Sequence, residues 1–101
     1  MNFQIEEDRN GVCVHMAGDL NFAANAEFKA VLDKLGHVAG RSVTFDLAKV
    51  PHIDSVGLGL LYIAKEEVVA AGTKIRLRSP QANVMKLLKL TDADADFEIL
   101  G

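Results

Sequence analysis

Residues 45–61, which read FDLAKVPHIDSVGLGLL, decide the fold of this chain. The apolar run up to Ile53 is typical of a buried strand, and Leu60 and Leu61 begin an apolar stripe at helical spacing. An aspartate, a hydroxyl and two glycines therefore stand where a strand gives way to a helix. The stretch raises the question whether Ser55 caps that helix, acts as a nucleophile or carries a regulatory switch.

Upstream of this stretch, the N-terminal residues predict a β-hairpin. Apolar residues alternate with polar ones over residues 2–7 and again over 12–17, as they do in half-buried strands. Asn10-Gly11 lies between the two runs and is the strongest short-range signal of a hairpin. The single cysteine, Cys13, cannot form an internal disulfide. We expect it in the core, because free cysteine is among the most buried residue types.

A first helix is predicted between the hairpin and a strand over residues 42–47. Its apolar residues have the i, i+3, i+4, i+7 spacing of one helix face. They are Phe28, Val31, Leu32 and Leu35. Asn21 or Asn25 is expected to cap the start of this helix, and Gly36 is expected to end it.

Two more helices are predicted downstream of the central stretch. One follows Ser55 directly and ends at Gly72, before an alternating strand over residues 74–78. The next begins at Ser79-Pro80, which offers a cap followed by a proline at the first helical position. Residues 96–100, which read DFEIL, alternate and predict a short closing strand.

The predicted order of elements is therefore β-β-α-β-α-β-α-β. Strands that alternate with helices pair in parallel through helical crossovers. The sequence thus predicts an α/β fold, a mixed β-sheet with an N-terminal antiparallel hairpin. A chain of 101 residues is long enough for one domain, and we assign residues 1–101 to it.

Composition and charge exclude several classes of function. The chain is 50% hydrophobic and 25% charged, which is ordinary for a soluble globular protein. A formal net charge of −3 argues against a nucleic-acid surface and against docking on anionic lipid. No apolar run is long enough to span a bilayer, and the N-terminus carries acids where a signal peptide is basic and then apolar. We therefore expect a cytoplasmic protein that binds neither nucleic acid nor membrane.

Polar residues gather where two neighbouring strands are predicted to end. GDLN follows the second strand and HIDS follows the third. In open α/β sheets, ligands bind outside the carboxyl ends of the strands. If these two ends adjoin, Asp19, Asn21, Asp54 and Ser55 form one polar patch at the N-terminus of the second helix.

The residues around Ser55 allow three interpretations. The simplest is a helix cap. A nucleophile elbow needs a glycine at the position of Ile53, and a dinucleotide loop that starts at Gly57 and Gly59 needs a third glycine where Tyr62 stands. A phosphorylation switch fits the pattern best, because a phosphoserine at a helix N-terminus meets unpaired amides and the positive end of the helix dipole.

With these residues in place, the sequence resembles the STAS domain in its stand-alone bacterial form, the anti-sigma factor antagonist. The resemblance covers nearly the whole chain. It is carried by F-D-L-x-x-V-x-x-I-D-S-x-G-L-G-x-L, by GDL after the second strand and by S-P-Q before the last long helix. It implies a single STAS domain over residues 1–101, with the STAS fold.

The resemblance implies a regulator of transcription that is not an enzyme. Unphosphorylated members bind a serine kinase of the histidine-kinase-like ATPase fold, which doubles as an anti-sigma factor, and thereby free the sigma factor. The kinase phosphorylates the serine that matches Ser55 and the complex dissociates, until a metal-dependent phosphatase of the PP2C type resets the switch. The resemblance implies no catalytic residue, no metal and no cofactor, and we expect a monomer. The implied partner-binding residues are Asp19, Asn21, Asp54, Ser55, Val56, Gly57, Leu58 and Gly59.

Two positions depart from the family pattern. Asn21 stands where members often carry an aspartate that shapes the phosphorylation site, so the negative charge at the site is reduced. Val56 stands where the residue after the serine is usually small. We expect the first change to affect the efficiency of phosphorylation and the second to tune the choice of partner.

Other functions stay open at this point. Some STAS domains are accessory subunits of lipid-transporting ABC complexes, but those often read D-T-x-G, so Ser55 favours the switch. A plain binding domain for a nucleotide or a lipid is a third hypothesis. A stressosome-type scaffold is a fourth.

The remaining charged clusters have simple interpretations. Asp92, Asp94 and Asp96 alternate as in a calcium loop, but Phe97 occupies the position of its glycine. The histidines lack metal-binding spacings. The cations of the 74–78 strand are too few for a nucleic-acid site, and we expect them to pair with acids of the preceding helix or to face water. These cations are Lys74, Arg76 and Arg78, and the acids are Glu66 and Glu67.

Overall fold

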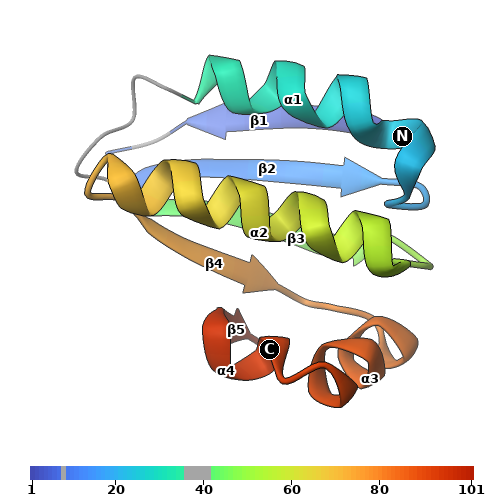
Figure 1. The fold of residues 1–101 in the computed structure, drawn as a ribbon. Helices are drawn as coiled ribbons and strands as arrows, with labels where there is room; N and C mark the ends of the chain where they lie inside the picture. The colour runs from blue at the N-terminus through green and yellow to red at the C-terminus, as the bar shows by residue number, and fades with distance from the viewer. Residues whose placement is uncertain (8, 36–41) are drawn as a thin grey trace.

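The computed structural model describes residues 1–7, 9–35 and 42–101 and shows a five-stranded sheet with helices packed against it (Figure 1). The elements follow in chain order as β1 (Asn2–Glu7), β2 (Gly11–Ala17), the 3₁₀-helix η1 (Phe22–Ala24), α1 (Asn25–Lys34), β3 (Ser42–Lys49), α2 (Ser55–Ala70), β4 (Lys74–Arg78), α3 (Ala82–Leu90), α4 (Ala93–Asp96) and β5 (Glu98–Leu100).

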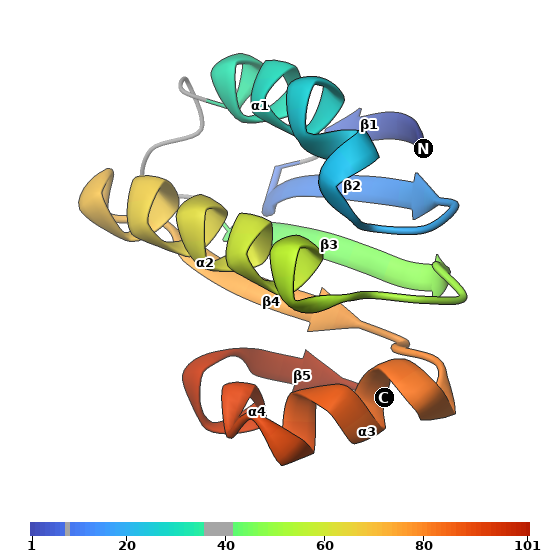
Figure 2. The ribbon, with the colours of Figure 1, turned by 45° about the vertical axis from the view of Figure 1, so that its right-hand side comes forward.

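The strands lie in the sheet in the order β1-β2-β3-β4-β5. β1 and β2 are antiparallel, and each later strand is parallel to its predecessor. The predicted mixed sheet with an N-terminal hairpin is therefore confirmed. Crossovers between parallel strands are almost always right-handed. Because the strand order follows the sequence, successive crossovers place α1 and α2 side by side on one face (Figure 2).

The core lies between this face of the sheet and the helices. Val12, Val14 and Met16 of β2 are buried, because alternate residues of a strand point to the same face. They belong to one buried cluster with Phe28 of α1 and Phe45 of β3, whose rings stack with centroids 5.7 Å apart.

The same alternation shows that the prediction for Cys13 is wrong. Cys13 is only half-buried, because it lies between Val12 and Val14 and so points to the opposite face of the sheet. His15 shares that face and is also half-buried. Period-2 alternation therefore outweighs the general tendency of cysteine to be buried.

The ends of two helices differ from the prediction. α3 begins at Ala82 with Gln81 at its N-cap position. Ser79 does not cap it, because Ser79 has a left-handed φ of 54° and its hydroxyl donates to the Gly101 carbonyl oxygen at 3.2 Å. The predicted C-terminal Gly36 of the first helix lies outside the described residues.

The start of α1 is also more elaborate than predicted. Asn21 caps η1, since its Oδ1 accepts a hydrogen bond from the Ala23 amide at 3.0 Å. η1 then continues into α1, whose first residue is Asn25. Asn25 is therefore part of the helix and not its cap.

Among the described residues, the cations of β4 form no ion pair with the acids of α2. The Arg76 side chain binds Glu98 of β5 at 2.9 Å, and Arg78 binds Asp46 of β3 at 3.0 Å. Strand neighbours on the same face supply these partners, because the side chains of α2 lie beyond the other face. The aspartates near the C-terminus are exposed and flank or form the single turn of α4.

None of the helices in the described residues has both the length and the apolar character that crossing a membrane requires.

Candidate functional site

The segments that follow β2 and β3 run side by side, beyond the carboxyl ends of these two strands. They form a parallel bridge. The Leu20 amide donates to the His52 carbonyl at 3.0 Å, and the Asp54 amide donates to the Leu20 carbonyl at 3.4 Å. These bonds hold the loop with Asp19 and Asn21 beside the loop that leads into α2. We call the residues gathered here the strand-end surface; they are Asp19, Asn21, Asp54, Ser55 and Val56.

Asp54, and not Ser55, caps α2. Asp54 has an extended backbone, and its Oδ1 accepts a hydrogen bond from the Gly57 amide at 2.8 Å. Ser55 is the first residue of the helix and is exposed. The simple cap interpretation of Ser55 is therefore wrong by one position. Within the described part of the chain, no hydrogen bond engages its hydroxyl.

Gly57 is a packing requirement. A Cβ at this position would lie 1.9 Å from the Leu20 carbonyl oxygen, so a side chain cannot be accommodated without moving the backbone. Gly57 and its neighbour Leu58 are buried. Both residues therefore lie beneath the protein surface, unlike the neighbouring Val56 and Gly59.

Gly59 has a different environment. Apart from its chain neighbours and the backbone of its own helix, no described atom lies within 4 Å of a Cβ built on Gly59, and the residue is exposed. Nothing inside the described structure therefore requires a glycine here, although glycine weakens a helix. Gly59 instead leaves a bare strip on the outer face of α2, between Val56 and Ile63.

Apolar side chains flank the strand-end surface. Val56 is 42% exposed, and Ile63 lies two turns further along the same face of α2 and is also exposed. Phe22 of η1, directly after Asn21, is 72% exposed. Sequence reasoning missed Phe22, although it lies off the periodic stripe of α1 and could have been recognised by that mismatch.

The described histidines are engaged elsewhere. The Nδ1 of His52 lies 3.3 Å from the Asn83 side-chain nitrogen, and His15 pairs with Asp46 on the open face of the sheet at 3.0 Å. His37 lies outside the described residues. A serine nucleophile needs a base within hydrogen-bond reach, and no described histidine offers one to Ser55.

A sequence model of the STAS domain matches residues 2–100 of the chain. This match spans nearly every residue that the structure describes.

Solved structures share the same fold. The protein TM1081 of Thermotoga maritima, a candidate anti-sigma factor antagonist, is 24% identical with a TM-score of 0.83, over 98% of this chain and 86% of that one. The anti-sigma factor antagonist SpoIIAA in its unphosphorylated form is 19% identical with a TM-score of 0.74, over 99% and 88%. The phosphorylated form of SpoIIAA, from Bacillus, matches with a TM-score of 0.67.

A membrane protein also contains this fold. The murine anion transporter Slc26a9 matches with 20% identity and a TM-score of 0.76. The match covers 91% of this chain but only 15% of the transporter. The fold therefore occurs both in small regulators and as a minor part of a much larger chain.

Proposed function

Because this chain belongs to the STAS domain family, we propose that it is an anti-sigma factor antagonist that works as a partner switch. While Ser55 is unphosphorylated, the chain binds a serine kinase of the histidine-kinase-like ATPase fold that is also an anti-sigma factor. Phosphorylation of Ser55 releases the chain, and a PP2C-type phosphatase restores it. The chain is a cytoplasmic substrate and binding module and has no catalytic activity of its own.

The observation that carries the proposal is the position of Ser55. It is the first residue of α2, it is exposed, and Asp54 supplies the cap in its place. A phosphoryl group on Ser55 therefore removes no described contact that holds the helix. The modification can change the surface while the fold stays intact, which a reversible switch requires.

The partial positive charge at the N-terminus of α2 also stabilises a phosphoserine at position 55. The amides of a first helical turn lack partners within the helix, and the helix dipole places positive charge there. A phosphoserine adds about −1.5 to −2 units of charge. That charge joins the exposed carboxylates of Asp19 and Asp54, so a partner that presents acids or apolar groups is repelled.

The surroundings of Ser55 suit a protein partner. The exposed apolar side chains of Phe22, Val56 and Ile63 offer contacts, and Gly59 lets a partner approach the backbone of α2 closely. Asp19, Asn21 and Asp54 surround them with polar groups. Gly57 and Leu58 contribute to this surface by shaping it from within.

The solved relatives support this assignment. SpoIIAA is an anti-sigma factor antagonist whose structure is known in an unphosphorylated and a phosphorylated form. Both forms have the fold described here.

Affinity capture from the native cell tests the proposal. Tagged wild type, Ser55→Ala, Ser55→Asp and Lys74→Gln would be compared, and co-purifying proteins identified by mass spectrometry. Lys74→Gln is the matched control, because it changes the net charge as Ser55→Asp does but lies exposed at the start of β4. A kinase of the ATPase type should be captured by every form except Ser55→Asp.

The captured kinase then allows a direct assay. With ATP and magnesium it should phosphorylate wild type at Ser55 and leave Ser55→Ala unmodified. A kinase held equally by wild type and Ser55→Asp, or phosphorylation at another residue only, would refute the switch. An ABC-transporter ATPase held equally by both forms would assign the chain to the transporter-subunit alternative.

A further inference from the structure

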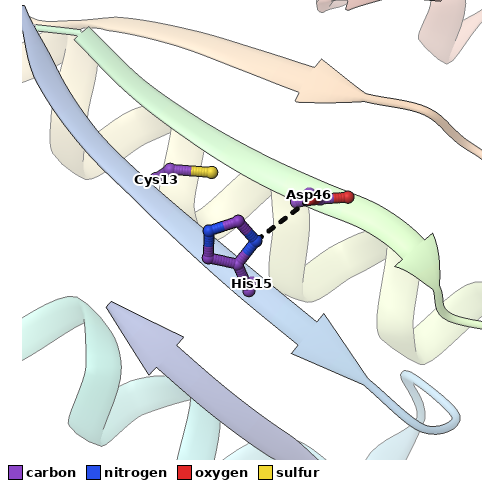
Figure 3. A group of neighbouring side chains, drawn as sticks. All are labelled: Cys13, His15 and Asp46. Carbon is purple, nitrogen blue, oxygen red and sulfur yellow. Dashed lines mark hydrogen bonds and ion pairs between the residues drawn. The ribbon is translucent and has the colours of Figure 1, made fainter. Parts of the chain in front are cut away.

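A second polar cluster lies on the face of the sheet opposite α1 and α2 (Figure 3). Cys13 and His15 project from β2, and Asp46 projects from the neighbouring β3; we call these three residues the open-face cluster. A sulfur, a ring nitrogen and a carboxylate oxygen from them all lie within 4.8 Å of one another. The side chains are half-buried, so solutes can reach them.

The backbone holds this arrangement in place. His15 and Asp46 are register partners in the parallel β2–β3 pair, and the register shifts immediately afterwards. At this irregularity the Ala48 amide donates to Asp46 Oδ1 at 3.0 Å. The other carboxylate oxygen, Oδ2, is thereby directed at His15 Nδ1, also at 3.0 Å. Bulges of this kind commonly re-aim a side chain next to a site.

Glu6 of β1 completes the surroundings of the imidazole. Its Oε2 lies 3.9 Å from His15 Nε2, on the side of the ring away from Asp46. Histidines that bind a metal through one nitrogen nearly always offer the other to a carboxylate, a carbonyl or water. Glu6 is positioned for that supporting role.

The Arg78 guanidinium already lies between the Cys13 sulfur and the Asp46 carboxylate. The Arg78 Nη2 lies 3.1 Å from Cys13 Sγ and 3.0 Å from Asp46 Oδ2. Burial disfavours ionisation of Asp46, but hydrogen bonds from the Ala48 amide, Arg78 and His15 outweigh it and lower its pKa. The Arg78 side chain is 39% exposed and has room to turn away.

We propose that Cys13, His15 and Asp46 bind a thiophilic divalent cation such as Zn²⁺, which takes the place of the Arg78 guanidinium. Thiolate, imidazole and carboxylate are the three donor types that zinc uses in proteins. Three protein ligands leave the fourth tetrahedral position open to water or an external ligand.

The observed spacing fits such an ion. Tetrahedral zinc with ordinary bond lengths separates neighbouring ligand atoms by roughly 3.3–3.6 Å. The nitrogen and oxygen of His15 and Asp46 are 3.0 Å apart, and the full set lies within 4.8 Å. Magnesium and calcium prefer oxygen ligands and do not fit a site with sulfur.

Titration of the untagged protein with Co²⁺ tests the site. Cobalt reports a thiolate ligand by charge-transfer absorption and tetrahedral geometry by the intensity of its visible bands. Zn²⁺ should displace the cobalt, and a chelator should remove either ion. Cys13→Ser and His15→Gln should abolish the spectrum, and Glu6→Gln should weaken binding about tenfold. These side chains are half-buried or exposed, and circular dichroism would confirm that each variant folds.

The role of Arg78 gives the sharpest comparison. Arg78→Gln should bind zinc at least about tenfold more tightly than wild type, because it removes the competing cation. Arg76→Gln is the matched control: it removes the same charge from the same face of β4, but Arg76 pairs with Glu98. Absence of zinc binding to wild type would overturn the proposal. So would an unchanged spectrum in Cys13→Ser, or equal gains in both arginine variants.

Discussion

Gly57 is the residue on which the junction between β3 and α2 depends most directly. The Leu20 carbonyl oxygen would lie 1.9 Å from a Cβ there, and that carbonyl also accepts the Asp54 amide. Any side chain at position 57 therefore separates the two segments that form the strand-end surface. The D-S-x-G pattern is thus a requirement of packing as well as a feature of the proposed switch.

We predict that Gly57→Ala destabilises the fold by about 3 kcal/mol or more, because overpacking against backbone cannot be relieved by a rotamer change. Urea unfolding followed by circular dichroism measures this loss. Gly59→Ala is the control, since open space surrounds position 59. It should stabilise α2 by roughly 0.5–1 kcal/mol. Equal effects of the two changes would contradict the packing argument.

At the scale of the element, the start of α2 divides the helix cap and the proposed phosphorylation site between two adjacent residues. Asp54 holds the helix through its bond to the Gly57 amide, whereas Ser55 is exposed on the first turn. Ser55 can therefore be modified while the Asp54 cap stays in place.

We predict that Asp54→Ala lowers the free energy of unfolding by about 1 kcal/mol, the usual cost of a lost cap. Ser55→Ala should change it by less than about 0.5 kcal/mol, as surface substitutions do. Denaturant unfolding of both variants beside wild type checks the ranking. The reverse ranking would restore Ser55 as the structural cap.

Tyr62 connects α2 to the C-terminal segment that contains α4. The Tyr62 hydroxyl donates to Asp96 Oδ2 at 2.5 Å, and the ring packs on Phe97 with centroids 5.2 Å apart. The bond to Asp96, with desolvation and nearby acidic charge, raises the pKa of Tyr62 to about 12. The phenolate is disfavoured because it would face the carboxylate.

We predict that Tyr62 ionises near pH 12 in the folded protein and closer to its ordinary pKa of about 10 in Asp96→Asn. The chain has one tyrosine and no tryptophan, so ultraviolet absorbance reports this group alone. The pKa of Tyr62 is raised in the folded protein. The hydrogen bond from Tyr62 to Asp96 therefore contributes fully to the free energy of unfolding below about pH 10, and this contribution is lost as pH rises towards 12. Identical titrations of both proteins would show that the bond is absent in solution.

At the scale of the whole molecule, one continuous core connects all the described layers. Buried residues of the strands, of α1 and α2 and of the C-terminal helices belong to one cluster. We predict a single cooperative unfolding transition, as small single domains show. Far-ultraviolet circular dichroism and Tyr62 fluorescence should give the same midpoint in denaturant. Distinct midpoints would mean that residues 1–101 contain more than one unit.

Periodicity made most of this architecture predictable. The hairpin around Asn10-Gly11, the order of elements and the helix after Ser55 follow from local patterns, and the loops after β2 and β3 adjoin because neighbouring parallel strands end at one edge. The prediction that α3 begins at Ser79-Pro80 was wrong, because the left-handed backbone of Ser79 cannot be read from its residue type.

The open-face cluster was not predictable from the sequence. Cys13 and His15 are close in sequence, but Asp46 and Arg78 join them only through the register of β2, β3 and β4. A shift of one residue in any strand would send these side chains to the other face. The irregularity that directs Asp46 at His15 leaves no signature in the residues themselves.

The order of strands in the sheet has a consequence for synthesis. Each strand pairs with the one that precedes it in the sequence, so a chain that leaves the ribosome N-terminus first always finds its neighbouring strand already made. No early strand has to wait with an exposed edge for a partner from the far end of the chain. Sheet growth can therefore keep pace with translation, and β5, which pairs only with β4, is added last as the final edge.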